Sequence, residues 1–424
     1  MIEIINIIFL IFSIQWICSI SYFSNNLFNY RFNNLEKVSF NLSLLLNIFL
    51  IFSFYKLNQQ YIFLLLLILP FLDYIFNRNK IFSENIIFLI FFTFVLSISI
   101  SSNLILEWDA AALWIYKTIN FLNGENFSNL SEVPGVISYP HLGPYIWSFF
   151  WKNSFINAEY TGRIFYIFIY CLSVLLIIDF NKKDLFKKIL VVSGFFIISL
   201  DYYLHSGYQE YLVFSTLIFI FYFYFKYFEN KKIFFLVPTI LFINAIIWMK
   251  NEASFFVLFF LFFVFFHHWV KKIKIKIEII ALTLFYFFAV IVKYLVFLNT
   301  FGEINIGWHN YEVNNYVNIF QLSYFTERTP AILISIFVAL IKCKVYLIFF
   351  LIIYFYLNKQ LKKDILPYLF FLILNLLLIY FIYYLTNDPN WKHYLATTVD
   401  RLLFQTSGIY LLPIFFILKK NTNL

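Results

Sequence analysis

Apolar runs of about 20 residues recur along the whole chain, and they constrain its fold more than any other feature. Of the 424 residues, 62% are hydrophobic and only 12% are charged, against roughly 25% charged in a soluble domain. So few charges cannot cover a water-soluble globule of this size. A backbone crosses lipid only as a helix or in a closed barrel, and these runs are continuous instead of alternating. The sequence therefore predicts an all-α polytopic membrane protein.

We predict a bundle of about 11 to 13 transmembrane helices in one domain, 1–424. It comprises N-terminal spans (1–106), an outer loop with interfacial helices (107–159), and further spans with short loops (160–424). Thirteen candidate spans begin near Ile2, Val38, Tyr61, Asn85, Tyr160, Lys188, Gln209, Ile233, Ala253, Glu278, Ala331, Ile365 and Leu403. The first run lacks a basic start and a small-residue cleavage site, so we expect a retained helix. Lys342 and Lys344 interrupt the run 331–357, which predicts a short interfacial helix followed by one span.

Basic residues predict the orientation of the spans. Five clusters fall on one side of the predicted bundle, which the positive-inside rule assigns to the cytoplasm. They are Lys182, Lys183, Lys187 and Lys188; Lys231 and Lys232; Lys271, Lys272, Lys274 and Lys276; Lys359, Lys362 and Lys363; and Lys419 and Lys420. The net charge of +9 is then topogenic and does not indicate nucleic-acid binding. The three cysteines lie in apolar runs without a CxxC pair, so neither a disulfide nor a cysteine-ligated metal is expected.

The long outer loop, 107–159, contains a predicted helix at residues 109–122. Its helical periodicity places five side chains on one face: Ala110, Leu113, Trp114, Lys117 and Phe121. We expect this helix to lie in the membrane surface and to end at Asn123-Gly124. A rigid turn at Tyr139-Pro140-His141 then leads into a second interfacial stretch.

Polar side chains gather in four islands, all on the predicted outer side. In the first, Glu107 and Asp109 can act as a general base and its supporting carboxylate; alternatively, Asp109 only caps the following helix. In the second, residues 201–210, Glu210 enters the next helix at membrane depth, where ionisable groups are costly and usually functional. The alternative is an acid favoured by the helix dipole.

The other two islands carry basic residues. Lys250 either faces an anionic headgroup or pairs with Glu252. Arg401 is suited to grip a phosphate, because its fork bonds two oxygens at once, with Asp400, His393 and Thr398 to orient it. The alternative is an arginine that reaches to the interface from a helix end.

In their order and common sidedness, the islands resemble bacterial membrane glycosyltransferases of the GT-C superfamily, the group with protein mannosyltransferases and lipid A aminoarabinose transferases. The similar stretches are Trp108-Asp109-Ala110 with Trp114, Lys117 and Tyr139-Pro140; Ser206-Gly207-Tyr208 with Glu210; Lys250-Asn251-Glu252; and His393 to Gln405 with Thr398, Asp400 and Arg401. The chain departs from the family pattern at Glu210, where Asp is more frequent, and at Ala253, where Gly is more usual.

The resemblance implies an inverting sugar transfer from a polyprenyl-phosphate donor to a glycan, lipid or protein hydroxyl. It implies a bacterial inner (plasma) membrane with the active site facing the periplasm or the exterior. Asp109 is then the general base and Glu107 supports it, while Arg401, Lys250 and His393 bind the donor phosphate. The expected substrate-binding residues are Glu210, Tyr139, His141, Lys117 and Asp400. No cofactor is expected; some members of the superfamily use a divalent cation, but no ligand set stands out here.

Three alternatives compete with this interpretation. A transporter or flippase of lipid-linked sugars should carry its polar residues near the bilayer midplane, in corresponding halves of the chain, whereas here they gather at span ends on one side. An O-antigen polymerase or ligase normally has its large outer loop late in the chain. A membrane protein without catalytic activity is the third alternative.

Overall fold

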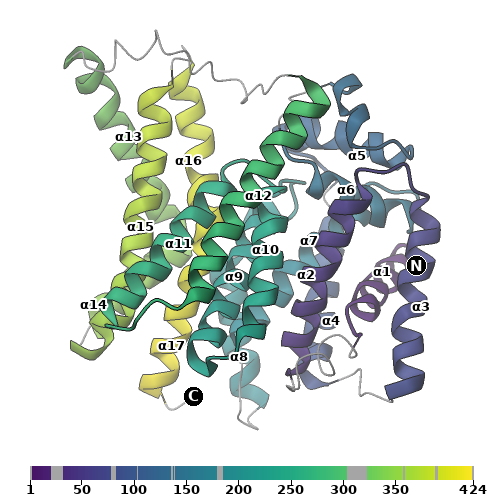
Figure 1. Ribbon diagram of the computed structural model, residues 1–424, viewed down its shortest axis with the longest axis horizontal. Helices are drawn as coiled ribbons and strands as arrows, with labels where there is room; N and C mark the ends of the chain where they lie inside the picture. Colours follow the sequence, from purple (N-terminus) through teal and green to yellow (C-terminus); the bar gives the residue numbers. More distant parts are fainter. Residues whose placement is uncertain are drawn as a thin grey trace.

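The computed structural model describes residues 2–20, 32–77, 83–102, 104–134, 137, 139–178, 185–302, 322–356, 359–386 and 390–422 (Figure 1). In these ranges the regular structure is helical throughout. The first helices are α1 (Ile2–Ile17), α2 (Asn34–Phe52), α3 (Gln59–Asn77), α4 (Glu84–Ser102), α5 (Ile115–Leu122), α6 (Leu142–Lys152), α7 (Tyr160–Ile177) and α8 (Leu185–Ser199). Those that follow are α9 (Glu210–Asn230), α10 (Leu236–Ile247), α11 (Ala253–Val270), α12 (Ile277–Phe301), α13 (Leu322–Lys342), α14 (Lys344–Tyr356), α15 (Lys359–Leu385), α16 (Trp391–Ser407) and α17 (Leu411–Thr422). Short π or 3-10 turns are η2 (Ala110–Trp114), η3 (Phe127–Glu132), η4 (Tyr202–Leu204), η5 (Ile233–Phe235) and η7 (Gly408–Tyr410).

Within the described ranges, nine stretches of helix are long and apolar enough to cross a bilayer. They lie in α2, α4, α7, α9, α11, α12, α13 and α15, and in the joined helices α16 and α17. Shorter apolar helices are α1, α3, α14, and α10 together with η5. Each of the predicted spans coincides with a helix in the part of the chain that the structure describes. The described chain thus has the helix lengths and composition of a polytopic membrane protein.

Helices α7 and α9 form the centre of the bundle. In the apolar stretch of α7 all residues are buried, and in α9 83% are, whereas the share is 22% in α12 and in α13. The peripheral helices expose large side chains such as Leu284, Phe288 and Phe337. Exposing so much apolar surface to water is unfavourable, so this surface must contact lipid or another protein. The burial pattern agrees with helices that face lipid.

The bundle has two ends of different chemistry. At one end α9 and α11 finish side by side, with the rings of Phe228 and His267 4.5 Å apart. The start of α15 joins them through the ion pair between Lys271 and Asp364. Figure 1 shows α8, α14, α17 and the C-terminus at this lower edge. The lysines that follow α9 and α11 therefore share one end, as predicted, while Lys182 and Lys183 lie outside the described residues.

At the opposite end, the predicted helix at 109–122 forms as η2 and α5 in direct succession. The five side chains predicted to share a face are all buried. Helix α5, which carries Lys117 and Phe121, packs against α6, which lies beside it in Figure 1. Trp108 and Tyr116 point outward and are exposed. Asn123 and Gly124 end the helix as expected: Gly124 has φ +87°, a left-handed conformation that favours glycine.

Two details of the predicted topology are wrong. The last span was expected to begin near Leu403 after an outer segment, but α16 already begins at Trp391, because its polar side chains bond to neighbouring helices instead of water. In the region of residues 331–357, the long helix comes first, as α13, and the shorter α14 follows a break at Cys343. The helix α13 starts at Leu322 because its polar first turns are satisfied by tertiary contacts: Arg328 donates to the carbonyl oxygen of Tyr383 (3.0 Å).

Candidate functional site

Three predicted residues from distant parts of the chain meet in one ion-pair cluster. Arg401 on α16 donates from Nε to Glu210 Oε1 (2.7 Å) and from Nη2 to Asp109 Oδ2. Glu210 is the first residue of α9, and Asp109 immediately precedes η2. The cluster therefore joins the outer loop to two central helices.

The cluster continues into the turn between α10 and α11. Lys250 Nζ contacts Glu210 Oε1 at 2.8 Å and Glu252 Oε1 at 3.1 Å. Gln405, one turn beyond Arg401 on α16, donates from Nε2 to Glu252 Oε1 (3.2 Å). Burial alone would lower the pKa of Lys250, but Glu210 and Glu252 raise it. Likewise burial would raise the pKa of Glu252, but Lys250 and the hydrogen bonds to this carboxylate lower it. Both groups are held in their charged forms.

The local alternatives fit some of these residues and not others. Glu210 lies in the first turn of α9, as the helix-dipole alternative has it, and Lys250 does pair with Glu252, but both also bond to residues of other elements. The local alternatives for Asp109 and Arg401 do not fit. Asp109 makes no side-chain capping hydrogen bond to its own helix and pairs with Arg401 instead. Glu210 is fully buried, and its carboxylate binds two cations from other elements. Arg401 is only 8% exposed and bonds inward, so it does not reach toward an aqueous interface.

Gly207 allows the loop before α9 to pass close to the outer loop. It has φ +79°, and an added Cβ would lie 2.8 Å from Leu106 Cδ2 and 2.9 Å from Ala110 Cβ. The backbone N–H of Glu107 donates to Ser206 O (3.0 Å), which fixes the two segments together. Any larger residue at position 207 would separate Glu210 from Asp109.

An aromatic ring and several buried polar atoms surround the cluster. The Arg401 guanidinium carbon lies 4.2 Å from the ring centroid of Tyr208, a cation–π contact. Two oxygens of cluster residues, Glu210 Oε2 and Gln405 Oε1, are buried without a hydrogen-bond partner in the described ranges, and so are both amide atoms of Gln209, the residue before Glu210. Buried polar atoms without partners are costly, so this region is chemically suited to a polar ligand.

Lys117, Tyr139 and His141 are the remaining predicted substrate-binding residues of the outer loop. Lys117 bonds to the backbone of Tyr139, whereas His141 lies among aromatic rings. Lys117 is buried and donates from Nζ to the carbonyl oxygens of Tyr139 (2.5 Å) and Ile137 (3.3 Å). Burial raises the pKa of Tyr139 to about 12; the charges of Glu252 and Asp109 add to this rise, and those of Lys250 and Arg401 oppose it. The Tyr139 ring lies 5.6 Å from that of Trp114.

His141 is fully buried at the start of α6. Its Nε2 lies 2.7 Å from Ser53 Oγ, and the rings of Phe127 and Trp248 are 4.5 and 5.5 Å away. These contacts give it a packing role at the joint of α2, α6 and the outer loop.

Besides Lys117, Tyr139 and His141, three further predicted residues are not part of the cluster. Asp400 was expected to orient Arg401, but it faces away on α16 and pairs with Lys342 (3.3 Å). His393 is exposed near the start of α16, with its ring beside that of Tyr394. Glu107 is exposed as well, and it bonds to the loop before α9 through its backbone N–H, which donates to Ser206 O.

Lys293 was missed by the sequence reasoning. It lies on α12 and donates from Nζ to Ile247 O (2.7 Å) and Asn251 Oδ1 (3.0 Å), next to the turn that carries Lys250. A single lysine inside an otherwise apolar 25-residue helix was the available signal, because charges at membrane depth are usually functional.

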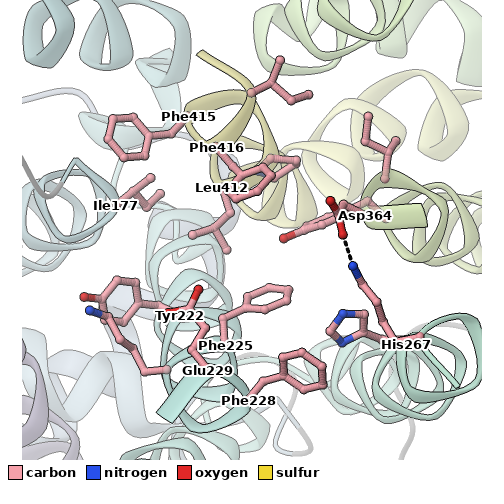
Figure 2. A pocket seen from close by; sticks show the side chains of 16 residues that line it. Ile177, Tyr222, Phe225, Phe228, Glu229, His267, Asp364, Leu412, Phe415 and Phe416 are labelled. Carbon is pink, nitrogen blue, oxygen red and sulfur yellow. Dashed lines mark hydrogen bonds and ion pairs between the residues drawn. The ribbon is translucent and has the colours of Figure 1, made fainter. Parts of the chain in front are cut away.

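A cavity of about 380 Å³ lies at the other end of the bundle and contains none of the cluster residues. It is bordered by the ends of α7, α9 and α11, the start of α15, and α17. Figure 2 shows Phe225, Phe228 and Phe415 around it, with Asp364 in an ion pair at one side. Among the described residues, no group of three or more His, Cys, Asp or Glu side chains is arranged to hold a metal ion.

Comparison with known proteins gives no further assignment. No protein-family model, no curated protein and no solved structure matches the chain.

Proposed function

We propose that this chain is a glycosyltransferase of the GT-C type, which transfers a sugar from a polyprenyl-phosphate donor to a hydroxyl acceptor at the outer face of a bacterial inner membrane. The observation that carries the proposal is the cluster of Asp109, Glu210, Lys250 and Arg401. It combines carboxylates with two buried cations at the end of the bundle opposite the lysine-rich end. A lipid-anchored phosphate donor requires such a pairing of base and cations near the membrane surface.

In the proposed reaction, Asp109 takes the proton of the acceptor hydroxyl as that oxygen attacks the anomeric carbon. The bond between the anomeric carbon and the phosphate oxygen breaks, and the lipid phosphate leaves with the bonding electron pair. Arg401 and Lys250 stabilise the negative charge that develops on the leaving phosphate. Attack from the face opposite the phosphate inverts the configuration at the anomeric carbon.

The contacts of Arg401 set a condition on this reaction. Its Nε and Nη2 serve Glu210 and Asp109, and a guanidinium has five N–H donors in a planar fork. A donor phosphate that binds to Arg401 therefore shares this cation with Asp109 and Glu210, and it has to use the N–H donors of the fork that these two carboxylates leave accessible.

The test is sugar transfer by the full-length protein in membrane vesicles, followed by mass spectrometry of the glycolipids. We expect Asp109→Asn to lose transfer by about 100- to 10,000-fold, the usual contribution of a general base, and Arg401→Ala by about 100-fold or more. The matched controls are Glu327→Gln and Lys392→Ala, which alter an exposed ion pair near the start of α16. Unchanged glycolipids in both site variants, at wild-type protein levels, reject the proposal and favour a transporter or a non-catalytic protein.

A further inference from the structure

A second pocket lies at the far end of α5 from Asp109. It has a volume of about 360 Å³. Three segments form it: the loop and first turn of α3, the end of α5 with the turn after it, and the last residue of α6. The lining residues are Lys56, Leu57, Asn58, Gln59, Gln60, Phe121, Leu122, Asn123, Gly124 and Lys152.

The polar side chains that line this pocket are basic or uncharged. It contains two lysines and four side-chain amides, and no carboxylate belongs to it. Lys152 Nζ donates to Leu122 O (3.1 Å), and Lys56 pairs with Glu125 (2.5 Å) at a site where the two side chains are 56% and 39% exposed. An exposed ion pair such as Lys56–Glu125 contributes little energy. An anionic ligand can therefore take the place of Glu125 on Lys56, and that of the carbonyl oxygen on Lys152. Amides bind hydroxyl groups as donors and as acceptors.

The pocket is rigidly connected to the ion-pair cluster. Gln59 donates from Nε2 to Phe121 O (3.3 Å) and to Ser148 Oγ (3.1 Å), so one pocket residue bridges α5 and α6. The continuous helix of η2 and α5 leads from Asp109 to Gly124, about 20 Å at 1.5 Å per residue. Around Gly124 no atom lies within 4 Å of an added Cβ, so the turn leaves open space on this side.

We infer that this pocket binds an acidic sugar unit of an acceptor glycan. The carboxylate of the sugar meets Lys56 and Lys152, and its hydroxyls meet Asn58, Gln60 and Asn123. A glycan with its acidic unit here has its reacting hydroxyl about 20 Å away, at Asp109. That the glycan is an acceptor rests on the proposed function, whereas the binding of an acidic saccharide does not.

The experiment measures equilibrium binding of tetragalacturonate to the purified full-length protein in detergent, with maltotetraose as the neutral probe. We expect tetragalacturonate to bind at least tenfold more tightly than maltotetraose, and higher salt to weaken its binding. The variant Lys56→Gln/Lys152→Gln should weaken it at least tenfold. Lys392→Gln, an exposed lysine elsewhere at the surface, is the matched control and should leave binding unchanged. Melting temperatures of all variants check that the fold is retained.

Several outcomes would overturn the inference. They are equal affinity for the acidic and neutral probes, a control variant as weak as the double variant, and no binding at all. Displacement of tetragalacturonate by phosphatidylglycerol vesicles but not by phosphatidylcholine vesicles assigns the pocket to a lipid headgroup and likewise overturns it. Binding that follows the expected pattern in a protein without transferase activity keeps the saccharide site and rejects the proposed function alone.

Discussion

Glu210 bridges the two cations of the cluster, since one of its oxygens accepts from both Arg401 Nε and Lys250 Nζ. The carboxylate is fully buried, and the two cations are 8% and 4% exposed. Buried charges are tolerated only while their partners remain in place. A cluster of this kind contributes little net stability, but it fixes the relative positions of η2, α9, α11 and α16.

The first prediction concerns the loss of this carboxylate. Glu210→Gln should lower the free energy of unfolding by about 3 kcal/mol or more, because it removes the buried carboxylate that Arg401 and Lys250 share and leaves each cation with one carboxylate partner, Asp109 or Glu252. Glu327→Gln breaks an exposed pair with Lys392 and should cost less than about 1 kcal/mol. Denaturant unfolding of both variants in the same detergent measures the difference. Similar stability of the two variants contradicts the buried-cluster description.

Lys117 gives a prediction about pH. Burial, with a further effect of Lys293, lowers the pKa of Lys117 to about 7, against about 10.4 in an unfolded chain. Between these values the unfolded state binds more protons, so stability should rise as the pH increases from about 7 toward 10. In Lys117→Met the rise in melting temperature between about pH 7 and 9 should be smaller than in the wild type. An equal rise in both proteins shows that Lys117 does not carry this effect.

At the scale of elements, close packing of α6 against α7 supports the outer loop. A Cβ added at Gly162 on α7 would lie 2.1 Å from the carbonyl oxygen of Trp147 on α6. Backbone cannot yield as a flexible side chain does, so the helices meet only because residue 162 is glycine.

The corresponding prediction uses two glycines in helices. Gly162→Ala should force α6 and α7 apart and lower the melting temperature, and it should reduce transferase activity because α6 carries the turn beside the cluster. Gly194→Ala on α8 meets no atom within 4 Å, and alanine is the better helix former, so its melting temperature should be equal or higher. A smaller loss in Gly162→Ala than in Gly194→Ala contradicts this packing.

The sequence predicts the helices well where they are apolar and poorly where polar residues enter them. Continuous apolar runs carry their own signal, so α7, α9 and α12 lie where they are expected. The predicted starts of α13 and α16 lie too far along the sequence. Between each true start and the predicted one lie polar residues such as Arg328 or Arg401, which on their own are typical of a loop, and their hydrogen-bond partners lie on other helices. A single sequence does not give those partners.

At the scale of the whole molecule, the polar cluster and the lysine-rich helix ends lie at opposite ends of the bundle. Asp109 and Arg401 are 292 residues apart in sequence and bond in the fold. Counting the spans puts the four polar islands on the same side of the membrane, and this predicts that they lie at the same end of the bundle. That Asp400 and His393 turn away depends on the rotation of α16, which sidedness alone does not determine.

The orientation of the bundle in the membrane is a further prediction. In a protein without Cys18, Cys171 and Cys343, we expect Asn123→Cys to react with a membrane-impermeant maleimide on intact cells. Lys272→Cys, at the lysine-rich end, should react only after the membrane is opened. The reverse pattern puts the cluster on the cytoplasmic side and contradicts the proposed location of the reaction.

The central claim is that the Arg401 cluster receives a lipid phosphate, and equilibrium binding of a polyprenyl monophosphate to the purified protein tests it most directly. We predict saturable binding that weakens at least about tenfold in Arg401→Gln, a loss of about 1.4 kcal/mol or more, and that stays unchanged in Lys392→Gln. Equal affinity of the wild type and Arg401→Gln, with both proteins folded, would contradict the claim.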